Sequence, residues 1–362
     1  VFFSHHEIDG IVGDFGGGSL ELTEVNTSKQ IKFIESLVIG HVVLKKIGNF
    51  DDKKVRKYID DSIQKVKLNK YSNFYAVGGS FRALAKLHMH IKSEDLKIIQ
   101  DYEVDSAEFL NELRTRIFVN KNTVDEKFLS QLFKSRKKSI PYTFNVLEML
   151  VQKMSIKKIF FTNTGVREGI LYDLVKDKGV DPFLSQIRKI ARGTIKKRNA
   201  EKLFSWILPF NDILQMDQNL LLSACWLTNI ASALHPEHRR IFALEKILYH
   251  QFFHLDRQNR IMLALILYFR YSNNLKENFA LSYSEKISKK NLIKVKILGQ
   301  LLRMAHHITG RLNYNNLDHC KLTINSINKV NFKAKKTYLL FGQSFERGMK
   351  NISDAFESLK SN

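Results

Sequence analysis

The sequence predicts an α/β fold for its first half, followed by an all-helical domain and a small α+β segment at the C-terminus. Strand-like and helical segments alternate up to about residue 175, which is typical of α/β proteins. Apolar helical segments then follow one another from residue 183 to residue 271 without a strand pattern, and alternation returns only near the end of the chain. We therefore expect three domains, over residues 1–180, 181–311 and 312–362.

Three glycine-containing corners organise the first domain, at Gly16–Gly18, Gly78–Gly79 and Gly165. Each follows a strand-like segment, and ligands of α/β folds gather at the carboxyl ends of strands, so we expect the corners to face one cleft. The expected elements are a strand hairpin over 10–25, a strand over 31–45, a helix over 51–68, a strand over 74–77, helices over 81–89, 125–134 and 141–154, a strand over 158–162 and a helix over 166–175.

The remaining two domains are predicted from helical spacing and from a final return of strand alternation. The helical stretches are 220–234, 241–253, 260–269 and 292–309, and they are followed by strands over 321–325 and 336–341 and a closing helix over 345–359. No internal repeat or low-complexity linker interrupts them.

Composition indicates a globular protein with an anionic partner or a basic compositional bias. Hydrophobic residues make up 44% of the 362 residues and charged residues 26%, as in folded domains. No apolar run approaches the roughly 18 residues that span a bilayer, so we expect no membrane association. The two cysteines suit a reducing cytoplasm. The net charge of +22 leaves two interpretations open, an anionic ligand or compositional drift, and the basic run over 188–202 is equally a solvated helix face.

The hairpin turn over Asp14–Glu21 is the most informative motif. Three adjacent glycines, Gly16, Gly17 and Gly18, together with Ser19, allow backbone amides to surround one anion, because no Cβ stands in the way. Asp14 ends the first strand and Glu21 begins the second, so two carboxylates flank the turn. A P-loop is excluded because Ser19 is followed by leucine, and a dinucleotide turn would open into a helix. An ordinary glycine-rich hairpin remains the alternative.

A second anion site is predicted where the strand over 74–77 meets the following helix. Gly78, Gly79 and Ser80 form the corner, and we expect Ser80 to cap the helix. The free amides of a helix's first turn bind anions, and Arg82 stands in that turn. A tight turn with a solvent-facing arginine is the alternative interpretation.

Taken together, these motifs resemble the exopolyphosphatase and guanosine-pentaphosphate phosphohydrolase (Ppx/GppA) family, which belongs to the actin-like, ribonuclease H-like ATPase fold group. Their order and spacing agree across roughly residues 8–175, and residues 226–238 of the helical part are similar at lower specificity. The matching motifs are Asp14-Phe15-Gly16-Gly17-Gly18-Ser19-Leu20-Glu21, Ser36-Leu37-Val38-Ile39-Gly40, Val77-Gly78-Gly79-Ser80-Phe81-Arg82-Ala83-Leu84-Ala85 and Thr164-Gly165-Val166-Arg167-Glu168-Gly169-Ile170-Leu171-Tyr172.

The resemblance implies hydrolysis of a terminal phosphoanhydride on linear polyphosphate or on a guanosine polyphosphate, with Mg²⁺. It implies that Asp14 and Glu21 hold the metal or activate water. The phosphate-binding residues would be Gly16, Gly17, Gly18, Ser19, Gly78, Gly79, Ser80 and Arg82. Arg167 and Glu168 are expected to be structural parts of a helix start. A non-catalytic binder of polyphosphate or nucleic acid is the alternative, but such a binder has no use for carboxylates inside an anion site, which disfavours nucleic acid.

Two departures from the family follow from the sequence. The family carries a further subdomain before the Asp14 strand, with its own phosphate loop and a water-activating glutamate. We therefore expect this chain to be truncated, and to be inactive or weakly active alone, because loss of a general base costs about 10²–10⁴-fold in rate. The helical part resembles a degenerate HD-like domain, in which Thr228-Asn229 replaces a His-Asp metal pair, so no metal is expected there. A homodimer is a further expectation from the resemblance.

Overall fold

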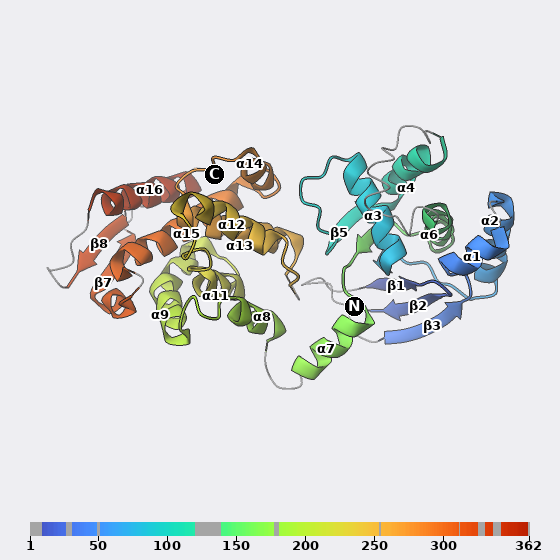
Figure 1. The fold of residues 1–362 in the computed structure, drawn as a ribbon, viewed down its shortest axis with the longest axis horizontal. Coiled ribbons are helices and arrows are strands. Elements are labelled where there is room, and N and C mark those ends of the chain that lie inside the picture. The colour runs from blue at the N-terminus through green and yellow to red at the C-terminus, as the bar shows by residue number, and fades with distance from the viewer. Residues whose placement is uncertain are drawn as a thin grey trace. The chain divides into compact units, whose positions relative to one another are not determined.

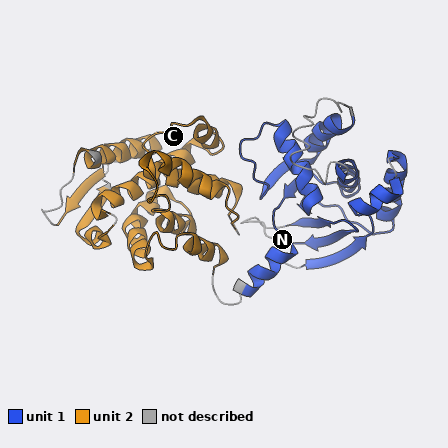
Figure 2. Cartoon of the chain, viewed as in Figure 1, with its two compact units in different colours: residues 1–174 blue, residues 175–362 orange. Residues whose placement is uncertain are grey.

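The computed structural model describes residues 9–26, 31–48, 51–119, 139–176, 181–252, 255–310, 312–324, 330–335 and 342–360. The chain forms two compact units, unit 1 over residues 1–174 and unit 2 over residues 175–362 (Figure 2). The domain boundary predicted after residue 180 adjoins residues 177–180, which lie outside the described residues. Among the described residues, no helix combines the length and the apolar character needed to cross a membrane.

Unit 1 is built on a six-stranded sheet of order β3-β2-β1-β4-β6-β5 (Figure 1). The strands β1, β2 and β3 form an antiparallel meander, β1, β4 and β6 are parallel neighbours, and β5 pairs antiparallel with β6. The bounds are β1 Gly10–Phe15, β2 Leu20–Val25, β3 Ile31–Leu37, β4 Asn73–Val77, β5 Tyr102–Asp105 and β6 Lys158–Phe161. The order places the ends of β1, β4 and β6, where the three glycine corners begin, side by side.

Helices cover one face of this sheet. They are α1 His41–Gly48, α2 Asp52–Gln64, α3 Gly79–Ile91, α4 Ser106–Arg114 with the π-helical turn η1 Thr115–Val119, and α6 Ile140–Met154; α7 Val166–Lys176 follows β6. Ile11 and Phe15 of β1 belong to the large core that includes residues of these helices. Val12 belongs instead to a small cluster with Tyr75 and Val77. Because side chains alternate along a strand, Asp14 lies on the same face as Val12.

The prediction that the strand over 31–45 includes residues 41–45 is wrong, because these residues form the start of the helix α1. The strand β3 ends at Leu37, and the amides of His41 and Val42 donate to carbonyls of the glycine turn. Sequence reasoning also missed β5 and α4. The strand has only four residues, and Asp105 at its end caps α4 by accepting from the amides of Ala107 and Glu108. The helix predicted over 125–134 lies outside the described residues.

Unit 2 is mostly helical, as predicted, with one small two-stranded sheet. Its bounds are α8 Pro182–Ile190, α9 Lys197–Ile207, η3 Leu208–Phe210, α10 Asn211–Leu214, α11 Gln218–Leu227, α12 Pro236–Leu248, α13 Arg257–Tyr271, α14 Asn278–Ser284, α15 Lys289–Thr309, η4 Tyr314–His319, β7 Cys320–Ile324, β8 Val330–Ala334 and α16 Gln343–Lys360. The central helix α13 is buried over residues 260–270 and packs against α12 and α15. The predicted strand over 336–341 lies outside the described residues. The partner of β7 is β8, which ends just before that segment.

The helices α13 and α15 approach closely at Gly299. A Cβ on Gly299 would lie 2.5 Å from Cβ of Phe269 and 2.7 Å from the carbonyl oxygen of Ile266. Real Cβ atoms do not approach backbone atoms this closely, so the crossing requires glycine there.

Gly299→Ala is therefore expected to lower the free energy of unfolding by about 1–3 kcal/mol through overpacking, despite the roughly 1 kcal/mol that alanine adds in helix propensity. Urea unfolding followed by circular dichroism measures the change. The matched control is Gly169→Ala in α7, where a Cβ would meet no atom within 4 Å and stability should stay equal or rise. Equal destabilisation by the two substitutions would contradict the requirement for glycine at the crossing of α13 and α15.

Candidate functional site

The glycine turn between β1 and β2 is held by the segment that leads into α1. The amides of Gly40, His41 and Val42 donate to the carbonyls of Gly18, Gly16 and Gly17, at 3.0, 3.3 and 2.9 Å. In a trans peptide the C=O and N–H groups point in opposite directions. The amides that follow these three carbonyls, those of Gly17, Gly18 and Ser19, therefore point away from α1.

Those three amides form the donor set of the turn. Among the described residues none of them has a hydrogen-bond acceptor, whereas the amide of Gly16 already donates to the carbonyl of Ser19 at 2.9 Å. Consecutive amides that point to one side bind anions. The turn thus offers an anion the amides of three of the four predicted residues.

Gly40 is essential to this arrangement for steric reasons. A Cβ on Gly40 would lie 2.3 Å from the carbonyl oxygen of Gly17 and 2.3 Å from the carbonyl carbon of Gly18. Only glycine allows the two chain segments to come so close.

The carboxylates of Asp14 and Glu21 lie opposite each other on paired strands. Asp14 of β1 is in register with Glu21 of β2, so both side chains project from the same face of the sheet. The hydroxyls of Ser19 and Ser36 both donate to Oε1 of Glu21, the latter at 3.3 Å. Burial raises the pKa of Asp14 above its ordinary value, and the neighbouring charge of Glu21 raises it further, while Arg82 opposes the shift.

The second corner lies against the end of β1. Asp14 is in parallel register with Val77, the last residue of β4, and Gly78 follows with a φ of 103°. A Cβ on Gly78 would lie 2.6 Å from the carbonyl oxygen of Phe15 and 3.2 Å from Oδ1 of Asp14. The two glycine corners therefore adjoin, with Asp14 between them.

The prediction that Ser80 caps the following helix is wrong. The helix α3 begins at Gly79, so the N-cap position is Gly78, and no side chain caps the helix. Ser80 is buried inside the first turn, where its hydroxyl lies 3.3 Å from Nδ1 of His41. The helix N-terminus itself stays available to an anion because no side chain occupies it.

Arg82 links this corner to the third one. Its guanidinium donates to the carbonyl of Asn163 at 3.0 Å, just beyond β6. The carboxylate of Glu168 accepts from the amide of Gly165 at 2.8 Å, which caps α7 and agrees with the structural role predicted for that residue. The positive charge of Arg82 thus lies near the carboxyl ends of three neighbouring strands.

His41 and Ser36 are site residues that sequence reasoning did not single out. Nδ1 of His41 lies 2.9 Å from the carbonyl oxygen of Gly16 and 3.3 Å from the hydroxyl of Ser80, so one imidazole ties together both corners. Because a carbonyl only accepts, Nδ1 carries a proton in this contact. The signal for His41 was its place directly after Gly40, at the first position of a helix whose buried residues Leu44 and Gly48 recur every four positions.

The oxygen donors of this site suit Mg²⁺. Mg²⁺ is usually held by one or two carboxylates together with substrate phosphates and water, and it prefers hard oxygen ligands. Asp14 and Glu21 are such a pair, and the mutual repulsion that raises the pKa of Asp14 would be relieved by a cation. Among the described residues, no group of three or more His, Cys, Asp or Glu side chains could form an all-protein metal site.

Two family models match the sequence. The Ppx/GppA phosphatase family matches residues 1–178, and the C-terminal model of exopolyphosphatase matches residues 214–343. The chain belongs to the Ppx/GppA phosphatase family. Family membership confirms the predicted fold class, an actin-like α/β subdomain followed by a helical part and a small C-terminal sheet.

Solved structures of a Ppx/GppA phosphatase from Aquifex aeolicus are similar to this chain. One has 19% sequence identity and a TM-score of 0.40, with 48% of this chain and 59% of that chain covered. Two others, one described as the type II variant, have 19% identity and TM-scores of 0.38, with 46% and 45% of this chain and 57% of theirs covered. The chain thus spans less than two thirds of the length of these structures. A search of curated proteins found no match.

The raised pKa of Asp14 predicts that this Ppx/GppA site reduces the stability of the fold. When a folded carboxyl has a higher pKa than its unfolded form, stability falls as the pH rises through that interval. Asp14→Asn is therefore expected to raise the melting temperature at pH 7, and the difference should shrink toward zero as the pH falls to about 4. Calorimetry at several pH values measures this. A lower melting temperature of the variant at pH 7 would contradict the prediction.

Proposed function

We propose that this chain binds the terminal phosphates of linear polyphosphate between its two adjoining glycine corners and takes part in hydrolysis of the terminal phosphoanhydride bond. The observation that carries the proposal is the position of Asp14, between the amides of the turn and the Gly78 corner. Amide donors attract phosphate, whereas a carboxylate repels it. A site for binding alone has no use for that charge, but phosphoryl transfer requires carboxylates for metal and water.

Each corner has its own part in this reaction. The amides of Gly17, Gly18 and Ser19 would donate to the oxygens of the terminal phosphoryl group, where negative charge is stabilised during transfer. The uncapped first turn of α3 and the guanidinium of Arg82 would bind the next phosphate along the chain. His41 would keep the two corners at a fixed spacing.

The carboxylate pair would hold Mg²⁺ and position the attacking water. When bound, Mg²⁺ neutralises phosphate oxygens and favours attack on phosphorus. The hydroxyls of Ser19 and Ser36 hold the carboxylate of Glu21 in one orientation, which suits a group that orients water and accepts its proton. The water oxygen forms the new bond to phosphorus as the bridging P–O bond breaks and the shortened polyphosphate leaves.

Guanosine pentaphosphate is the competing substrate, because its terminal phosphoanhydride would meet the same groups. Comparison of phosphate release from long-chain polyphosphate and from guanosine pentaphosphate, at equal terminal-phosphate concentration with Mg²⁺, separates the two. We further propose a cytoplasmic location, which is supported by two free cysteines, both buried.

Glu21→Gln should reduce phosphate release from polyphosphate by about 10²–10⁴-fold, because the amide can neither accept the proton nor hold the metal as well. Polyphosphate affinity, measured by calorimetry, should change much less. Glu24→Gln is the matched control, since Glu24 lies on the same strand three residues beyond Glu21 and pairs with Ile11, away from the turn.

Two results would contradict the proposed reaction. One is equal phosphate release by the two variants. The other is binding of polyphosphate with a steep salt dependence and no phosphate release by the unaltered protein, either alone or joined to an upstream extension, which would favour the non-catalytic binder.

A further inference from the structure

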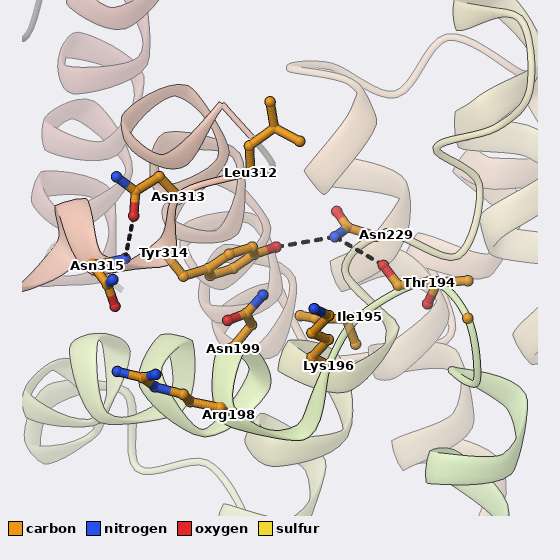
Figure 3. A pocket seen from close by; sticks show the side chains of 11 residues that line it. Thr194, Ile195, Lys196, Arg198, Asn199, Asn229, Leu312, Asn313, Tyr314 and Asn315 are labelled. Carbon is orange, nitrogen blue, oxygen red and sulfur yellow. Dashed lines mark hydrogen bonds between the residues drawn. The ribbon is translucent and has the colours of Figure 1, made fainter.

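Unit 2 contains a polar cavity of about 630 Å³ that the glycine corners do not explain (Figure 3). It is formed by unit 2 alone, where four segments meet: the α8–α9 loop, the first turn of α9, the residue Asn229 beyond α11, and the segment after α15. The lining residues are Gly193, Thr194, Ile195, Lys196, Arg198, Asn199, Asn229, Leu312, Asn313, Tyr314 and Asn315. A cavity of this size accommodates a ligand as large as a nucleotide.

One side of the cavity is positively charged. Lys196 and Arg198 line it, neither makes an ion pair within the described part of the chain, and none of the described lining residues is acidic. The helix α9 begins between them, at Lys197, without a capping side chain, so its positive end adds to this charge. Lys202, one turn further, is already paired with Asp318 at 2.5 Å.

The other side of the cavity is neutral and rich in carboxamides. Asn229, only 5% exposed, donates from Nδ2 to the hydroxyl of Tyr314 at 3.0 Å and to the carbonyl of Thr194 at 3.4 Å. Its carboxamide oxygen accepts no hydrogen bond from any residue that the structure describes. Figure 3 shows Asn229, Tyr314, Asn313 and Asn315 on this side, whereas Asn199 lies on α9, on the side of Lys196 and Arg198. A hydroxyl or amine of a ligand in the cavity could therefore donate a hydrogen bond to the carboxamide oxygen of Asn229.

We propose that this cavity binds a small phosphate monoester with a neutral polar body, the chemistry of a nucleoside monophosphate. The phosphate would lie against Lys196, Arg198 and the start of α9, and the neutral body would face the asparagines and Tyr314. Linear polyphosphate fits less well, because it carries charge along its whole length while the cations occupy one side only. None of the described lining residues is Asp, Glu, His or Cys, and the proposal is for binding alone. The proposal is independent of the function assigned to the glycine corners.

Isothermal titration calorimetry with adenosine monophosphate tests the proposal on the full chain. Arg198→Ala is expected to weaken binding about tenfold or more, as the loss of a charged hydrogen bond does. Lys197→Ala is the matched control and should leave affinity unchanged, because Lys197 does not line the cavity and lies near Glu201 at 3.7 Å. Both residues are exposed on one helix, so neither substitution threatens folding.

Further arms of the titration identify the location and the ligand. Arg82→Ala should leave adenosine monophosphate binding unchanged, and a loss there would place the ligand at the glycine corners and overturn the proposal. Adenosine should bind much more weakly than its monophosphate; equal affinity would overturn the role of the charged side. If tripolyphosphate bound more tightly than adenosine monophosphate and this binding required Arg198, the proposed recognition of an uncharged ligand part by the neutral side would be wrong. If adenosine monophosphate did not bind at millimolar concentration, the proposed binding site would be wrong.

Discussion

The geometry of the glycine turn in unit 1 depends on three hydrogen bonds between two short segments. The amides of residues 40–42 hold the carbonyls of residues 16–18, and planar trans peptides then turn the amides of residues 17–19 the other way. Without those three bonds a triple-glycine turn would have many conformations of similar energy. The segment after β3 therefore fixes the three amides on one side of an otherwise flexible turn, and the requirement for glycine at position 40 follows from the same contact.

Around that turn, the sheet concentrates charges that the fold alone would not favour. Asp14 is half-buried, faces Glu21 across paired strands, and has Gly78 packed against it. Its raised pKa expresses the cost of this placement. An electrostatic cost of this kind is expected at a site that would bind a cation together with a polyanion, because the cation would neutralise the carboxylates and also the charge of the polyanion.

Unit 2 contrasts with this site in its chemistry. Its cavity combines cations on one side with carboxamides on the other and has no carboxylate among the described lining residues. The charged side would attract an anion, and none of the described lining residues is a carboxylate that could activate water. The proposed roles of the two units therefore differ: reaction at the glycine corners and binding alone in the cavity.

The sequence by itself determined the class of fold and which residues are candidates for the chemistry. The glycine runs, the two flanking carboxylates and the change to helical spacing after residue 183 are local signals, because each depends on steric freedom or periodicity within a few residues. Tertiary structure alone decided what Ser80, His41 and Gly16 do. Ser80 is buried in the first turn of α3, and the Gly16 amide donates within its own turn. His41 contacts both glycine corners, including Ser80, which lies 39 residues further along the sequence. Those outcomes depend on which amides and side chains from distant segments meet, and periodicity along one segment carries no information about that.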